Sequence, residues 1–149
     1  MNWSKDSSIT LSRACVILFM VLLAALDIGC YWTVQWFTQL RLMSRQAVFL
    51  MMATIYLCSI FGWVLLARMW QLLRNIRAQI VFEPQNVALL RQVSWCCVGA
   101  GLVCTVSCVY YLPFIVIAVA AGFMALIVRI IKNIFQQAID MKSELDLTI

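Results

Sequence analysis

Four long apolar runs decide what this chain can fold into. They extend over residues 11–37, 47–69, 93–112 and 114–131. Each run has close to the 20 apolar residues that a helix needs to cross the hydrocarbon core of a bilayer. The sequence therefore predicts an all-α, polytopic membrane protein with four transmembrane helices in a bundle.

The composition leaves little material for anything else. Hydrophobic residues make up 65% of the chain and charged residues only 11%, whereas about a quarter of the residues in soluble domains are charged. We therefore expect residues 1–149 to form a single membrane domain. The first apolar run continues past Leu26 without an A-x-A-like cleavage site, so we interpret it as a retained span and not as a signal peptide.

The basic residues predict how the spans are oriented. Of the 11 Lys and Arg residues, only Arg41 and Arg45 fall on one side of the predicted spans. The others fall on the opposite side and are Lys5, Arg13, Arg68, Arg74, Arg77, Arg91, Arg129, Lys132 and Lys142. By the positive-inside rule, the second side and with it both termini are expected to be cytoplasmic.

Spans two, three and four are each expected to continue into the cytoplasm as helices. After span two, apolar residues recur at helical spacing as far as Ile80, and the run Phe82-Glu83-Pro84 then favours a break, with Pro84 in the first turn of the next helix. Residues 70–92 should thus form a helical hairpin. Residues 132–149 should form an amphipathic helix that ends in a short extended segment from Glu144.

Two stretches of these cytoplasmic segments carry a resemblance to a known family. The terminal run QAIDMKSELDLTI, residues 137–149, resembles the closing signature of the bacterial family catalogued as domain of unknown function twenty-nine seventy-five, and the hairpin segment around Phe82-Glu83-Pro84 is similar to the family's loop. The resemblance implies a multi-pass protein of the bacterial cytoplasmic (inner) membrane. Many members are encoded beside an XRE-type helix-turn-helix regulator, which suggests a membrane partner that tethers or modulates a transcription factor.

Our leading hypothesis is therefore a non-enzymatic integral membrane interaction protein. The residues expected to contact the regulator are Phe82, Pro84, Asn86, Ile139, Asp140, Lys142, Glu144, Asp146 and Leu147. The chain has no histidine, which removes the commonest general base and a common metal ligand, so we expect no catalytic residue, metal or cofactor. An immunity protein or a sensor of membrane stress would use the same architecture, and a chain this small is also a candidate for homo-oligomers.

Asp27 supports an alternative function, because it is the one acid embedded in an apolar run and intramembrane carboxylates often mark ion or proton pathways. A small four-span transporter centred on Asp27 would use it to couple transport to protons or cations. The competing interpretation is structural: at about 21 Å along the helix from Arg13, Asp27 would lie in the outer part of the membrane. There it could pair with Arg41, Arg45, Tyr110 or Tyr111.

The remaining polar and sulfur-containing residues have simpler interpretations. Cys97, Gly101, Cys104 and Cys108 share one helical face, and small residues at this spacing favour close helix packing over a metal or redox site. Trp63 is expected to pack between helices. The basic hairpin is interpreted as an orientation signal that attracts anionic lipid headgroups, and direct nucleic-acid binding is not expected because no recognition-helix motif accompanies it.

Overall fold

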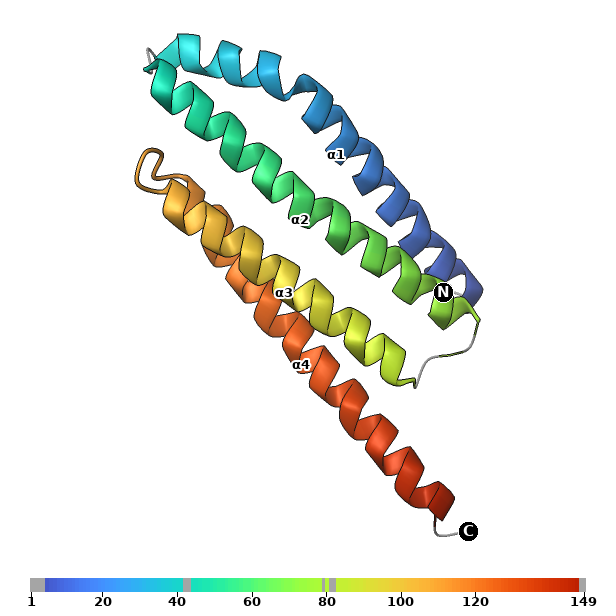
Figure 1. Ribbon diagram of the computed structural model, residues 1–149. Helices are drawn as coiled ribbons and strands as arrows, with labels where there is room; N and C mark the ends of the chain where they lie inside the picture. Colours follow the sequence, from blue (N-terminus) through green and yellow to red (C-terminus); the bar gives the residue numbers. More distant parts are fainter. Residues whose placement is uncertain (1–4, 42–43, 79, 81–82, 148–149) are drawn as a thin grey trace.

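The computed structural model describes residues 5–41, 44–78, 80 and 83–147 (Figure 1). Within this part of the chain, all regular secondary structure is helical. The helices are α1 (Lys5–Arg41), α2 (Arg45–Arg77), α3 (Pro84–Ser107) and α4 (Phe114–Leu147). Each is long and apolar enough to cross a membrane. The structure therefore confirms the predicted all-α fold with four spans.

The four antiparallel helices pack in the order in which they occur in the chain. Close approach of their backbones is confined to the pairs α1–α2, α2–α3 and α3–α4 within the described residues. Figure 1 accordingly shows α1 and α4 at the two outer positions, with α2 and α3 between them. The bundle is thus an open layer and not a ring of helices.

The helix boundaries near the hairpin follow from local sequence. Glu83 has the extended backbone (φ −122°, ψ 142°) that the residue before a proline favours, and Pro84 is in the first turn of α3, as predicted. Helix α2 ends at Arg77, three residues before the predicted limit at Ile80. The amide of Ile80 bonds the carbonyl of Asn75 at 3.0 Å, which closes the turn at the end of α2.

The connection between α3 and α4 is longer than the single residue that separates the third and fourth apolar runs. Helix α3 ends at Ser107, whereas the apolar run suggested that it would continue to residue 112. The ring of Tyr111 lies 5.5 Å from that of Phe114 and 5.9 Å from that of Phe37 in α1, both edge to face. Because these aromatic rings pack against one another, an apolar segment forms a compact turn here and not another turn of helix.

Helix α4 is one continuous helix as far as Leu147, so the predicted extended segment from Glu144 is wrong in the described residues. No glycine or proline interrupts this stretch, and extending an existing helix costs far less than starting one. The hydroxyl of Ser143 also donates to the carbonyl of Asp140 at 2.7 Å. The alternating pattern, six residues from Glu144 to Ile149, was too short to outweigh these effects.

The two ends of the layer differ in charge, as expected. Both ends of the described chain and the α2–α3 connection lie at one end of the layer, which we call the basic end (Figure 1).

At the basic end, the guanidinium of Arg13 lies over the ring of Trp70, 4.6 Å from its centre, and links α1 to α2. Close to it, Val16, Leu66 and Leu73 form a buried apolar cluster between the same helices.

Candidate functional sites

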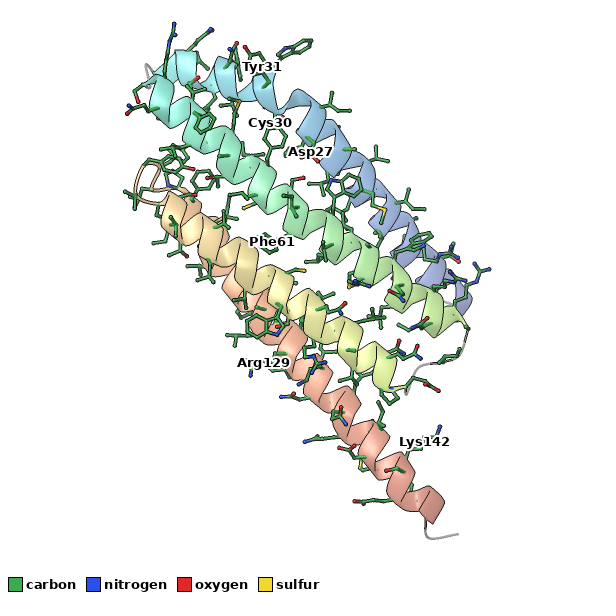
Figure 2. All side chains as sticks on the ribbon, in the orientation of Figure 1. Asp27, Cys30, Tyr31, Phe61, Arg129 and Lys142 are labelled. Atoms are coloured by element: carbon green, nitrogen blue, oxygen red, sulfur yellow. The ribbon has the colours of Figure 1, made fainter. Side chains whose placement is uncertain are left out.

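Asp27 forms the centre of a small polar cluster between α1 and α2. Its Oδ2 atom accepts hydrogen bonds from the Ser59 hydroxyl at 2.8 Å and from the Trp63 indole nitrogen at 2.9 Å. Its Oδ1 atom is buried and has no hydrogen-bond partner. Figure 2 shows Asp27 on the side of α1 that faces α2. One oxygen of this carboxyl group is thus held by two donors, while the other remains available for a proton or a ligand.

These contacts differ from the expected ones. The hydroxyl of Tyr110 bonds to Thr54 and to the carbonyl of Leu50, and the ring of Tyr111 packs on Phe37. Ser59 lies at the middle of the second apolar run. Asp27 is therefore near the midplane of the spans, deeper than the outer position we predicted, and its partners come from the adjacent helix.

Trp63 makes a contact that we did not predict. We expected it only to pack, and its indole N–H donates to Asp27. A tryptophan that pairs with an acid and one that only packs look the same in a sequence. The spacing of 36 residues between Asp27 and Trp63 gave no signal, because it depends on the register in which α1 and α2 pack.

A second polar cluster joins α2 to α3 and to the turn that follows α3. The hydroxyl of Thr54 hydrogen-bonds to that of Ser107 at 2.7 Å and to that of Tyr110. Thr54 and Ser107 are both buried. Buried hydroxyl groups that satisfy one another across helices stabilise membrane proteins only modestly, so we assign this cluster to fixing the register of the two helices.

A cavity of about 210 Å³ lies beside these clusters and is lined by residues from all four helices. Thr54 and Ser59 both line it, so the cavity touches the hydroxyl that holds Asp27. Most of its other lining residues are apolar. It has room for several water molecules, each of which occupies about 30 Å³ in the liquid.

The cysteines on the predicted face of α3 are buried or partly buried, in agreement with the predicted packing role. Cys97, Gly101 and Cys104 are buried on one face of α3. The Sγ atoms of Cys104 and Cys58 lie 3.6 Å apart, and both residues are free thiols. In the described part of the chain, no three His, Cys, Asp or Glu residues are grouped closely enough to hold a metal ion.

In the hairpin, Asn86 has a structural position that the sequence did not indicate. Its side chain is fully buried, accepts a hydrogen bond from Asn75 Nδ2 at 2.8 Å and donates to the carbonyl of Ile80 at 2.7 Å. It thus joins the end of α2 to the start of α3. A side chain enclosed in this way cannot contact a partner in this conformation, whereas Pro84 is exposed. Phe82 lies outside the described residues.

The terminal part of α4 carries the other residues proposed to bind a partner. Asp140, Lys142 and Glu144 are exposed and Ile139 is partly buried. Asp140 accepts a hydrogen bond from Gln136 at 3.0 Å, one helical turn before it. The helix includes Asp146 and Leu147, but their side chains lie outside the described part of the structure. The hairpin and the terminal segment thus lie at the same end of the molecule (Figure 1).

Comparison with known proteins gives a family match over nearly the whole chain. The sequence profile of a family described as Protein of unknown function (DUF2975) matches residues 5–149. This match confirms the resemblance that the terminal run and the hairpin segment indicated. Searches of the curated proteins and of the solved structures give no match.

Proposed function

Because the chain belongs to the DUF2975 family of proteins of unknown function, we propose a role argued from its own geometry: a non-enzymatic membrane protein that holds a soluble regulator at the membrane surface. The contact is made by the end of α4. In this proposal the membrane is the bacterial cytoplasmic membrane, and the basic end of the layer faces the cytoplasm, as the positive-inside rule predicts.

The observation that carries the proposal is the length of α4. Phe135 is the last α4 residue in the apolar cluster formed with Leu72, Leu89 and Leu90. Beyond it, α4 continues to Leu147 and extends away from the α2–α3 connection (Figure 1). A helix that leaves its own bundle while remaining helical presents its surface to water or to a partner.

The exposed surface of this segment suits a protein partner. Ile134 and Met141 are 58% and 60% exposed, and at seven residues apart they lie on the same side of the helix. Asp140 and Glu144 are exposed one turn apart. An apolar stripe beside carboxylates favours a basic partner with an apolar groove, and DNA-binding proteins are basic because they bind phosphates. A small helix-turn-helix regulator, which the family resemblance suggests, meets this description.

The hairpin contributes differently from what we first expected. Asn86 shapes the connection between α2 and α3, so we remove it from the proposed contact surface. Pro84 stays in the proposal because it is exposed at the same end of the molecule.

The proposal is tested by binding between the purified full chain in detergent and a purified helix-turn-helix regulator from the same genome. Met141→Gln and the double variant Asp140→Asn, Glu144→Gln should each weaken binding at least tenfold. Ser143→Ala is the matched control, because it is exposed and on the opposite side of the helix from Met141. Equal binding by all variants, or no binding by the wild type, would contradict the proposal.

A second candidate function, a small proton-coupled transporter, is favoured by Asp27 alone. Its Oδ1 atom is buried without a partner, and Ser59, which donates to Oδ2, lines the adjoining cavity. A buried carboxylate with an unsatisfied oxygen is costly and often functional. Proteoliposomes with an imposed pH gradient and a fluorescent cationic dye test this role. Dye efflux that is lost in Asp27→Asn and kept in the control Asp140→Asn supports transport. Equal efflux rates in all chains, or no efflux in any chain, exclude transport of this dye through Asp27.

A further inference from the structure

A cavity of about 260 Å³ between α3 and α4 concentrates positive charge. Arg91, Arg129 and Lys132 line it together with Ser94, Trp95 and Val98, and none of these residues is acidic. Figure 2 shows Arg129 on α4. Three cations around one cavity repel each other in the absence of an anion, so this arrangement favours an anionic ligand.

The cavity continues into a groove of about 280 Å³ between the same helices. The two share Ser94, Val98 and Arg129. From Arg129 the groove extends along α4 to Ala118, which at 1.5 Å per residue is about 16 Å. Apart from Ser94, Thr105 and Arg129, its lining is formed by glycine and aliphatic side chains. Half of a hydrocarbon core about 30 Å thick is about 15 Å, so the groove is as long as one leaflet is deep.

The position of the cavity fits the boundary between lipid headgroups and acyl chains. Trp95 is 68% exposed, and tryptophan is enriched at the interface between the headgroups and the acyl chains of a membrane. Arg91 precedes the third apolar run, and Lys132 follows the fourth. Leu102, farther along the groove, is 62% exposed and belongs to a span, so the groove opens towards the bilayer and not towards water.

The groove has a fixed shape because α3 and α4 are held close together on one side of it. The Ser94 hydroxyl donates to the carbonyl of Ala125 at 3.1 Å. A Cβ atom on Gly101 would lie 3.5 Å from that of Ala121, in ordinary contact. A Cβ atom on Gly122 would meet nothing within 4 Å. The helices therefore touch near Gly101, while the space in front of Gly122 stays open.

We infer that α3 and α4 form a binding site for one anionic phospholipid, with its phosphate between Arg91, Arg129 and Lys132 and one acyl chain in the groove beside Gly122. Guanidinium groups bind phosphate oxygens in pairs of hydrogen bonds, and basic pockets between transmembrane helices are suited to acidic headgroups. A soluble phosphate compound would use the cations but would leave the apolar groove empty. This inference does not depend on the proposed function.

The test compares an anionic and a zwitterionic phospholipid that carry the same acyl chains and differ in the headgroup. The full chain in neutral detergent is mixed with phosphatidylglycerol or with phosphatidylcholine carrying the same acyl chains, and native mass spectrometry measures the bound lipid. We expect one phosphatidylglycerol per chain, bound at least tenfold more tightly than phosphatidylcholine. Equal binding of the two lipids would overturn the inference.

Removal of two cations tests the headgroup position. Each Lys or Arg near an anionic surface strengthens attraction about fivefold, so Arg129→Gln with Lys132→Gln should weaken phosphatidylglycerol binding about 25-fold. The matched control is Arg74→Gln with Arg77→Gln, which removes two exposed cations from the same end of the protein but outside the cavity. The inference is wrong if the two double variants bind the lipid equally.

A change within the groove separates a lipid from a free phosphate. Gly122→Leu fills open space in the groove and should weaken phosphatidylglycerol binding at least fivefold. The leucine side chain would crowd the acyl chain, as an added side chain overpacks a protein core. Gly29→Leu on α1 is the matched control, since a Cβ atom there also meets nothing within 4 Å. Glycerol phosphate should compete only weakly with phosphatidylglycerol. If it competes at equal concentration, or if Gly122→Leu binds phosphatidylglycerol with unchanged affinity, the site binds phosphate and not a lipid.

Discussion

At the scale of single residues, the two oxygens of Asp27 have unequal surroundings. Oδ2 accepts from Ser59 and Trp63, whereas Oδ1 is buried without a partner. Hydrogen bonds to a charged group contribute more than those between neutral groups, and a buried oxygen without a donor costs part of that gain. We therefore expect Asp27 to make only a small net contribution to stability.

The contribution of Ser59 can be measured directly. Ser59→Ala removes one donor to Asp27 and should lower the free energy of unfolding by about 1 kcal/mol, in the range found for hydrogen bonds between membrane helices. Ser12→Ala is the control, because the hydroxyl of Ser12 is exposed and bonds only the carbonyl of Ser8. Unfolding titrations in mixed detergent micelles give both values. An equal effect of the two substitutions would show that the Ser59 bond to Asp27 adds nothing.

Asn86 should matter more for stability than any exposed hairpin residue. Asn86→Ala removes from a fully buried position the side chain that bonds Asn75 Nδ2 and the Ile80 carbonyl, and each hydrogen bond contributes about 0.5–1.5 kcal/mol. We expect a loss of about 1–3 kcal/mol in the free energy of unfolding and faster proteolysis between α2 and α3. Gln85→Ala, at an exposed neighbouring position, should change neither measurement. Similar proteolysis rates for the two variants would contradict this role of Asn86.

At the scale of secondary-structure elements, α2 and α3 approach closely where a glycine faces an aromatic ring. A Cβ atom on Gly99 would lie 2.6 Å from Cε1 of Phe61, which is far inside normal contact. Figure 2 shows Phe61 between α2 and α3. Gly99 is thus required by the neighbouring helix, since its own helix would tolerate alanine better.

This close approach predicts a compensating pair of substitutions. Gly99→Ala should destabilise the protein by about 1–3 kcal/mol, because Phe61 must move within a packed interface. Adding Phe61→Leu should recover part of the loss. Gly122→Ala is the matched control, because its new methyl group enters open space. Thermal unfolding in detergent compares the stability of the wild type, the two single variants and the double variant. A double variant no more stable than Gly99→Ala would show that Phe61 is not the cause of the loss.

The sequence predicted the elements better than the contacts between them. Apolar runs and Pro84 located four helices and the hairpin break, because crossing a bilayer and starting a helix depend on local composition. The ends of α3 and α4 were misjudged, since aromatic packing around Tyr111 and continuation of an existing helix are not local patterns. Asp27 was identified as unusual from sequence, but Ser59 and Trp63 were not, because their positions depend on how α1 packs on α2.

At the scale of the whole molecule, charge separates the two ends of the layer. Arg45 lies at the end opposite the basic end, close to the start of α2, while Arg129, Lys132 and Lys142 lie on the part of α4 nearest the basic end and beyond it. Moving basic segments across a bilayer is unfavourable. This asymmetry predicts one orientation for all four spans.

Reporter fusions test that orientation. A green fluorescent protein joined after residue 149 should fluoresce, because it folds in the cytoplasm, and alkaline phosphatase at the same position should be inactive. Phosphatase joined after residue 44, between the first two spans, should be active because it is exported. The opposite result at both positions would reverse the predicted orientation and place the phospholipid site in the other leaflet.

In the described residues, close backbone contacts join each helix only to its neighbours in the chain, and this affects how the protein is made. Every interface, α1–α2, α2–α3 and α3–α4, joins segments that leave the ribosome one after the other. Contacts between segments close in sequence form quickly, because little chain entropy is lost in bringing them together. Each new span can therefore pack its backbone on the span before it as soon as it enters the bilayer. Side-chain contacts such as that of Phe37 in α1 with Tyr111 form later, when the turn after α3 has been made.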